Sequence, residues 1–294
     1  MYNNQLKNEY FVGFKVIKHL THSTISFLII TFVQSLVMIL FPEIVFGPIK
    51  SRRFGKSLGV NLLPAEAKFC SFDCVYCECG LNMQTSGKKK VLPTLDEVQV
   101  AMEKKFSELA ENGVIPDSIT FAGNGEPTLH PEFAGIIEET IHLRNAYLPE
   151  SEITVLTNGT QVKKAEVAQA LSLIENNVLK LDAGTNKLFH LINRPVSTLR
   201  LEEVIDYYSR FEGTSIIQTM FLRGKVNDDV IDNTTETEVA LWLDHIRKIK
   251  PEWVMIYGID RIPPFSTLEK VEKATMQKIA TQVENAGFKA DTYC

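Results

Sequence analysis

The chain has 294 residues and a mass of 33.2 kDa, and its 45% hydrophobic and 23% charged residues are typical of a folded protein with a full core. This composition excludes an intrinsically disordered chain, and the absence of a short repeat excludes collagen-like and coiled-coil architectures. A net charge of −5 argues against non-specific nucleic-acid binding, although a local basic patch could still serve a structured RNA. Five cysteines are too few for a disulfide scaffold, and three that fall within eight residues indicate a metal or redox site in a reducing compartment.

The amino-terminal segment carries an almost wholly apolar run from Ile25 to Leu40. A membrane-spanning helix needs about 20 apolar residues, and this run is shorter and interrupted by polar residues. The following Phe41-Pro42-Glu43 lacks the small residues of a signal-peptide cleavage site. Three interpretations stay open: a membrane anchor, a partly buried helix, or residues that are not translated because the true start is Met38.

We therefore separate an N-terminal apolar segment, residues 1–39, from one globular domain, residues 40–294. No stretch rich in Pro, Gly or Ser divides the latter. The expected location is the cytoplasm, and membrane contact is expected only through residues 25–40.

Strand-like and helix-like segments alternate along this domain. Strands are predicted in six short apolar or β-branched runs: Gly59–Leu63, Ser118–Ala122, Ile153–Thr157, Val178–Asp182, Ser215–Phe221 and Trp253–Tyr257. Helices are predicted where apolar residues recur with helical spacing: Thr94–Asn112, Pro131–Leu143, Lys163–Glu175, Leu199–Phe211, Thr235–Ile249 and Ser266–Ala286. Six strand–helix units favour an α/β fold, a partial (β/α)6 barrel of parallel strands with outer helices. In this fold the site is expected at the carboxyl ends of the strands.

Cys70, Cys74 and Cys77 stand in CSFDCVYC, directly after the first predicted strand. Four thiolates would close a tetrahedral structural site, whereas three can hold a cubane iron–sulfur cluster and leave one iron free to bind a small molecule. Zinc is the alternative, although it usually comes with paired C-x2-C elements or histidines. Cys79 could supply a fourth thiolate, but its place two residues after Cys77 is cramped. We therefore interpret Cys79 and Cys294 as incidental thiols.

This C-x3-C-x2-C motif after the first strand of an α/β pattern resembles the radical S-adenosylmethionine (SAM) superfamily, over roughly Phe46 to Ile262. The stretches FGPIKSRRFGKSLGVNLLP (Phe46–Pro64) and GNGEPTLHP (Gly123–Pro131) look like the wyosine-synthase-related bacterial branch of 4Fe–4S oxidoreductases. The resemblance implies that the three cysteines hold a 4Fe–4S cluster whose open iron binds SAM. It also implies reductive cleavage of SAM to methionine and a 5′-deoxyadenosyl radical, which abstracts a hydrogen atom from the substrate.

The resemblance further assigns SAM contacts to residues at successive strand ends. Gly125 and Glu126 match the Gly-Gly-Glu element that holds the amino group of SAM, although an asparagine replaces one of the two adjacent glycines. Thr157 and Asn158 are assigned to the SAM ribose. Tyr76 stands between the last two cluster cysteines, where the superfamily has an aromatic side chain that packs near adenine.

The fourth predicted strand places Lys180 and Asp182 on one face and leucines on the other, because side chains alternate along a strand. The leucines are expected to pack under the helices, and the two charged residues then face the inner side, where a buried charge needs a partner. They form either a structural ion pair or part of the site. We favour the site, with Lys180 on the SAM carboxylate and Asp182 facing the substrate. Arg194 could reach the same opening, and Arg52 and Arg53 could contact a phosphate or a substrate carboxylate.

The sequence thus predicts a radical SAM enzyme with a 4Fe–4S cluster and SAM as cofactors, and with a reductant such as flavodoxin or ferredoxin as a partner. The wyosine-related branch suggests a tRNA base as substrate, while a small molecule or a peptide stays open. No cysteine precedes Cys70, so the second cluster of the archaeal and eukaryotic wyosine enzymes is not expected. Two alternatives stay open: a non-catalytic iron–sulfur or zinc protein that senses redox state or scaffolds partners, and a glycyl-radical activase.

Overall fold

The computed structural model describes residues 38–293, and Ile39–Cys294 form one compact unit. Nearly all of the predicted N-terminal segment lies outside the described residues, as does Cys294, so the predictions for them stay predictions. Within residues 38–293, no helix has the length and apolar character needed to cross a membrane.

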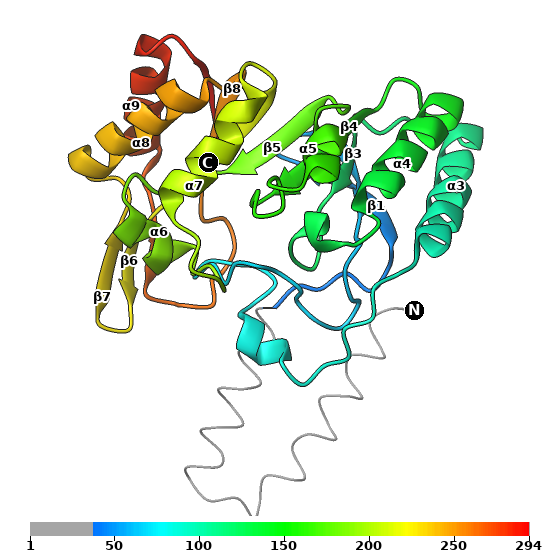
Figure 1. Cartoon of the computed structure of the whole chain (residues 1–294), viewed down its shortest axis with the longest axis horizontal. Coiled ribbons are helices and arrows are strands. Elements are labelled where there is room, and N and C mark those ends of the chain that lie inside the picture. Colours follow the sequence, from blue (N-terminus) through cyan, green and yellow to red (C-terminus); the bar gives the residue numbers. More distant parts are fainter. Residues whose placement is uncertain (1–37, 294) are drawn as a thin grey trace, which may run out of the picture. The chain divides into compact units, whose positions relative to one another are not determined.

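A ten-stranded sheet forms the centre of this unit (Figure 1). Eight strands lie side by side in the order β1-β2-β3-β4-β5-β6-β8-β10, and β7 and β9 each pair with β6. From β2 to β10 all neighbours on this path are parallel, whereas β1 is antiparallel to β2. The strands are β1 (Val45–Ser51), β2 (Gly55–Val60), β3 (Ser118–Phe121), β4 (Glu152–Thr157), β5 (Asn176–Lys180), β6 (Ser215–Val226), β7 (Asp229–Asp232), β8 (Trp253–Gly258), β9 (Leu268–Lys270) and β10 (Lys289–Tyr293).

Helices cover the outer face of the sheet (Figure 1). They are α3 (Leu95–Glu111), α4 (Phe133–Tyr147), α5 (Ala165–Leu171), α6 (Asn186–Ile192), α7 (Leu201–Tyr208), α8 (Glu236–Ile249) and α9 (Lys273–Asn285). Strand residues such as Leu179, Ile217 and Val254 share one buried apolar core with helix residues such as Ile136 and Trp242. The predicted α/β fold, with parallel strands and outer helices, is therefore confirmed.

The element boundaries follow local sequence signals where those are strong. Thr94 caps α3: its hydroxyl accepts a hydrogen bond from the Glu97 amide, and the Glu97 carboxylate accepts one from the Thr94 amide. The helix predicted over Ser266–Ala286 is wrong in its first part, because β9 pairs with β6 there and α9 begins only at Lys273. The sequence analysis also missed β1, β7 and β10.

The inner face of the sheet carries a second, smaller apolar cluster, formed by Val178, Ile216 and Met255 on three neighbouring strands. Phe54, from the turn between β1 and β2, packs against this cluster. The same turn places Arg53 beside Gln218, which is two residues beyond Ile216 along β6. The β1–β2 turn therefore reaches into the inner side of the sheet.

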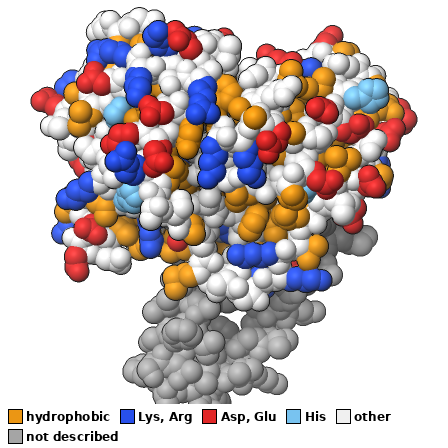
Figure 2. Space-filling model, viewed as in Figure 1, with side chains coloured by type: hydrophobic (Ala, Val, Ile, Leu, Met, Phe, Trp, Pro, Cys, Tyr) orange, Lys and Arg blue, Asp and Glu red, His pale blue; other side chains and the backbone are white. Residues whose placement is uncertain are grey.

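The surface carries both signs of charge. Figure 2 shows Lys and Arg side chains interspersed with Asp and Glu side chains over the face in view. An interspersed surface produces no large single-sign field on this face.

Candidate active site

A cavity of about 270 Å³ opens at the carboxyl ends of the parallel strands. It is near the lower end of the volume range for small-molecule sites. The cavity brings together the residues that the sequence analysis assigned to the cluster and to SAM: Cys70, Tyr76, Cys74, Cys77, Gly125, Glu126, Thr157, Asn158 and Lys180. These residues come from the loops after β2, β3 and β4 and from β5 itself.

The cysteine loop is held by the end of α6. The Asp73 and Val75 amides donate to the carbonyls of Asn193 and Ile192, at 3.0 and 2.9 Å. Within the loop, the Cys77 amide donates to the Cys74 carbonyl at 3.1 Å. These backbone bonds present three thiols from one short segment to one cavity.

Lys68, two residues before the first cysteine, is a buried cation beneath this loop, with only 1% of its side chain exposed. Its Nζ donates to Oδ1 of Asp73 at 3.1 Å and to the carbonyl of Gly80 at 2.9 Å. Burial lowers the pKa of Lys68, but its attraction to the neighbouring cysteines, Cys77 first, and to Asp73 outweighs burial and raises it. Lys68 is therefore a fixed positive charge that links Asp73, within the cysteine loop, to Gly80, which follows the loop.

The four thiols of this loop differ in their protonation. Burial raises the pKa of Cys70, and it raises the pKa of Cys74 to about 11. The pKa of Cys77 is lowered to about 6, chiefly by a hydrogen bond from the Cys79 thiol, against the opposing effect of burial. The Cys79 sulfur also lies 3.1 Å from the Gly123 carbonyl oxygen. Cys79, which the sequence analysis treated as incidental, thus lies in the cavity wall and affects its neighbour.

Glu126 is the buried carboxylate of the cavity, with 2% of the residue exposed. Its Oε1 accepts hydrogen bonds from the Thr157 and Thr128 hydroxyls at 2.6 and 2.5 Å, and from the Thr128 amide at 3.1 Å. Its Oε2 accepts one bond, from the Asn158 amide at 2.6 Å. Burial raises the pKa of Glu126, although these hydrogen bonds oppose the shift. Because each carboxylate oxygen offers about two acceptor sites, Oε2 keeps one for a ligand.

The segment before Glu126 fits closely against the cysteine loop. The Glu126 amide donates to the Phe69 carbonyl at 3.0 Å, and the Phe69 amide donates to the Asn124 carbonyl at 2.8 Å. Gly125 has φ +144°, and a Cβ there would lie 2.0 Å from the Phe69 carbonyl oxygen. Asn124 is fully buried, and its amide group bonds to the backbone of Phe41 and Pro64. The packing therefore requires a glycine at position 125. A glycine at position 124 would lose the side-chain hydrogen bonds by which Asn124 holds the backbone of Phe41 and Pro64.

Two asparagines hydrogen-bond to the cysteine sulfurs. Asn158 Nδ2 donates to the Cys70 sulfur at 3.6 Å and to the Ser71 hydroxyl at 3.0 Å. Asn193 Nδ2 donates to the Cys74 sulfur at 3.5 Å and to Oδ2 of Asp182 at 2.6 Å. Hydrogen bonds to the sulfurs are one way in which a protein tunes an iron–sulfur site.

Asp182 lies behind the cavity lining and contacts residues that form it. Its Oδ2 also accepts from the Tyr76 hydroxyl, and its Oδ1 accepts from the Met220 amide at 2.9 Å. Lys180 Nζ donates to the Tyr76 hydroxyl at 2.8 Å and lies 3.7 Å from Oδ2 of Asp182. Burial lowers the pKa of Lys180, but the charge of Asp182 and further negative groups outweigh burial and raise it. Lys180 is therefore a cation whose position is fixed by Tyr76 and Asp182.

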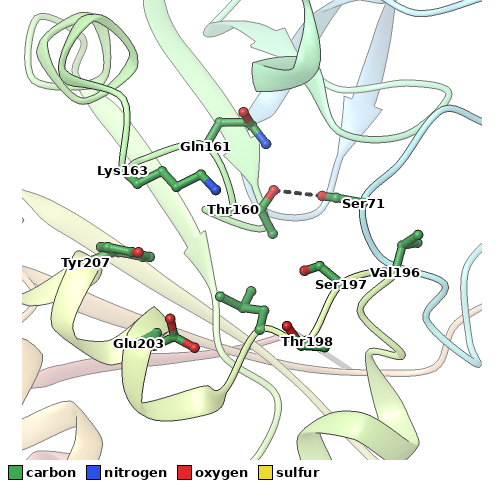
Figure 3. A pocket seen from close by; sticks show the side chains of 10 residues that line it. Ser71, Thr160, Gln161, Lys163, Val196, Ser197, Thr198, Glu203 and Tyr207 are labelled. Carbon is green, nitrogen blue, oxygen red and sulfur yellow. Dashed lines mark hydrogen bonds between the residues drawn. The ribbon is translucent and has the colours of Figure 1, made fainter.

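Ser71, directly after Cys70, lines a second cavity of about 400 Å³ (Figure 3). Figure 3 shows hydroxyl, amide and charged side chains around it, including Lys163 and Glu203 on opposite sides. The Ser71 and Thr160 hydroxyl oxygens are 2.7 Å apart and form part of its wall. The sequence analysis did not predict this cavity, because its residues come from α7 and from loops that are far apart in the sequence.

Comparison of the sequence with protein-family models identifies the superfamily to which these residues belong. The family model described as the radical SAM superfamily matches residues 67–236, more than half of the chain. The chain belongs to the radical SAM superfamily. Iron–sulfur and SAM binding follow from this membership, and SAM-dependent radical chemistry is the general activity of the superfamily.

Relatives of similar sequence include UPF0026 proteins. The Helicobacter pylori protein is 32% identical over 229 residues, which are 76% of this chain and 68% of the relative. The Synechocystis protein is 33% identical over 225 residues, 75% of this chain and 77% of the relative. The Methanocaldococcus jannaschii protein is 30% identical, and the match covers 66% of this chain and 59% of the relative.

Solved structures share the radical SAM fold. A radical SAM methyltransferase from Sphaerobacter thermophilus has a TM-score of 0.60 at 16% identity, over 81% of this chain and 65% of that one. Streptococcus suis SuiB bound to S-adenosylmethionine has a TM-score of 0.56 at 15% identity, over 78% of this chain and 49% of that one. The chain therefore spans about half to two thirds of these proteins, and the similarity concerns the fold alone.

The donor set of the cavity fits the superfamily's iron–sulfur cluster. Among the described residues, no group of three or more His, Cys, Asp or Glu side chains closes around a single metal ion. A cubane cluster does not need such a group, because each thiolate binds a different iron. Three thiols on one loop that line one cavity, two of them receiving N–H bonds, match this requirement better than they match zinc.

Two residues predicted to contact substrate do not line the radical SAM cavity. Asp182 is buried, and its oxygens are engaged with Tyr76, Asn193 and Met220, so its geometry supports a positioning role. Arg194 is exposed, has φ +47°, and contributes its carbonyl to the Asp73 amide. Thr157, predicted to bind ribose, lines the cavity and donates its hydroxyl to Glu126; the ribose contact stays a prediction.

Sequence reasoning missed the role of Lys68. Its only signal was a basic residue two positions before the cysteine motif, which resembles any solvated lysine until its burial is known. The Asn193 contact with Cys74 was missed for a similar reason, because 119 positions separate the two residues.

Proposed function

We propose that this protein is a radical SAM enzyme whose Cys70, Cys74 and Cys77 hold a 4Fe–4S cluster with one iron left for SAM. The observation that carries this proposal is the convergence of these three thiols, Glu126 and Lys180 on one cavity at the strand ends. When bound, the cluster supplies the electron that cleaves SAM to methionine and a 5′-deoxyadenosyl radical, which takes a hydrogen atom from the substrate.

The chain's own residues bind and orient SAM in this proposal. The amino group of SAM donates to Oε2 of Glu126, the carboxylate oxygen that accepts only one hydrogen bond from the protein. The SAM carboxylate pairs with Lys180, whose ammonium Tyr76 and Asp182 hold in place. Thr157 and Asn158 orient Glu126 and the cysteine loop, and Asn158 remains the candidate for the ribose.

The ring of Tyr76 and the ring of Tyr257 are the candidate walls for adenine. Both line the cavity, and the Tyr257 hydroxyl lies 3.4 Å from Lys180 Nζ. An aromatic wall excludes water from the place where a radical would form, which protects it from side reactions. The substrate and the reductant are part of the proposal: a tRNA base is the substrate suggested by the family-like stretches, and flavodoxin or ferredoxin is the reductant.

The proposal is tested by SAM cleavage under anaerobic conditions. The full chain is reconstituted with iron and sulfide, reduced with dithionite and given SAM, and 5′-deoxyadenosine is quantified. We expect the nucleoside from the wild type and from Cys79→Ala, and none from Cys74→Ala. Equal nucleoside formation by Cys74→Ala would remove the cluster assignment. An intact cluster that never cleaves SAM would favour the redox-sensor alternative.

A further inference from the structure

Arg53 is a cation of the active-site cavity whose polar partner is uncharged. Its Nη1 donates to Oε1 of Gln218 at 2.8 Å, and its guanidinium carbon lies 5.0 Å from the centre of the Tyr257 ring. Across residues 38–293, no carboxylate forms an ion pair with Arg53. Within the described residues, its charge is therefore held in the cavity wall without a neutralising partner.

The other charged residues of this cavity already have hydrogen-bond or ion-pair partners within the described residues. Glu126 accepts four hydrogen bonds from hydroxyls and amides. The remaining charges form ion pairs: Arg261–Glu78 at 2.5 Å, Asp260–Arg52 at 3.3 Å and Lys180–Asp182 at 3.7 Å. Arg53 thus differs from the neighbouring Arg52, which lies on the same turn and has a carboxylate partner.

Arg53 comes from the β1–β2 turn, whereas Lys68 precedes the cysteine loop and Lys180 lies in β5. Lys68 and Lys180 are the positive groups that act most on the Cys70 and Cys74 thiols. Arg53 instead acts on Tyr293 at the end of β10, where its charge opposes the rise in pKa that burial causes. Both groups that hold Arg53 also adjoin Lys180, because Gln218 pairs with Lys180 between β6 and β5 and the Tyr257 hydroxyl lies 3.4 Å from Lys180 Nζ. The two cations therefore face one part of the cavity, and only Arg53 lacks an acidic partner among residues 38–293.

We infer that Arg53 binds an anionic group of the substrate, either a carboxylate or a phosphate. This inference rests on the proposed function, because it assigns SAM to Glu126 and Lys180 of the same cavity. A neutral substrate that covered Arg53 would strip water from an unpaired charge at a considerable cost. An anionic group restores the lost interaction, and the planar guanidinium can donate two parallel hydrogen bonds to it.

The neighbouring contacts suit this role. Gln218 fixes one edge of the guanidinium with a neutral hydrogen bond, and Tyr257 supports its face. Phe54, the next residue, anchors the β1–β2 turn in the inner apolar cluster. The arginine is thereby pre-organised, so that little side-chain entropy is lost when the anion binds.

Calorimetric titration of the full reconstituted chain tests this inference with inorganic phosphate and acetate as separate probes. Arg53→Gln removes the charge, Arg53→Lys keeps the charge but not the planar fork, and Arg52→Gln is the matched control on the same turn. SAM is titrated into each variant in parallel.

We expect Arg53→Gln to weaken binding of the preferred probe at least fivefold, Arg53→Lys to have a smaller effect, and Arg52→Gln to have none. Preference for phosphate over acetate would indicate a phosphorylated substrate, and the reverse preference a carboxylated one. No measurable binding of either probe, or equal losses in Arg52→Gln and Arg53→Gln, would overturn the inference. An equal loss of SAM affinity in Arg53→Gln would also overturn it, since Arg53 would then belong to the SAM site. Failure of the proposed function would show itself separately, as absence of SAM cleavage by the wild type.

Discussion

Replacement of Lys68 by Met tests whether a buried charge holds the cysteine loop. The substitution keeps the apolar stem and removes the ammonium that donates to Asp73 and Gly80. Breaking a buried ion pair by removing one partner costs about 3–5 kcal/mol. Asp73 keeps the bond from the Asn82 amide at 2.7 Å and is 18% exposed, so we expect the lower end, about 3 kcal/mol.

The assay is urea unfolding of the metal-free chain, followed by circular dichroism, for Lys68→Met, Asp73→Asn and the double variant. Because the two residues contact each other, we expect the double variant to lose about 0.5–3 kcal/mol less than the sum of the single losses. A loss below about 1 kcal/mol for Lys68→Met, or strict additivity, would refute the reasoning.

Three further predictions concern the same cavity. In metal-free protein at pH 7, iodoacetamide should modify Cys77 before Cys74, because a thiol with a pKa of about 6 is mostly thiolate there and one with a pKa of about 11 is mostly protonated. The difference in rate should fade as the pH approaches 11. Equal rates of modification at pH 7, followed by mass spectrometry, would contradict this prediction. Gly125→Ala should destabilise the chain by about 1–3 kcal/mol and lower its iron content, whereas Gly87→Ala, where a Cβ meets nothing within 4 Å, should do neither. Glu126→Gln should weaken SAM binding at least tenfold by calorimetry with iron content unchanged, and wild-type affinity would disprove its role.

Much of the fold was predictable because the local signals and the tertiary structure agree. Five of the six predicted strands coincide closely with observed ones, since each is a short apolar or β-branched run bounded by turn residues. The first, predicted over Gly59–Leu63, is observed earlier, as β2 over Gly55–Val60. Strand β10 was missed because Lys289, Asp291 and Thr292 give it the polar character of an edge strand. Strand β9 was hidden inside an expected helix, since its three residues are too few to show a period of two.

The sequence was enough to predict which residues line the cavity, but not which contacts each of them makes. Cysteine spacing and strand-end positions identified the lining of the cavity. The sequence carries no sign that Asp182 is buried or that Thr157 serves Glu126, because both facts depend on contacts between separate strands. Lys180 was placed correctly on the inner face by strand alternation, yet its link to Tyr76 spans 104 positions.

The most direct test of the central claim is the electron paramagnetic resonance spectrum of the reduced, reconstituted protein with and without SAM. If Cys70, Cys74 and Cys77 leave one iron open, the signal of the reduced 4Fe–4S cluster should change when SAM binds that iron. The change should be lost in Glu126→Gln at SAM concentrations that saturate the wild type. A reduced cluster whose spectrum is the same with and without SAM would contradict the account.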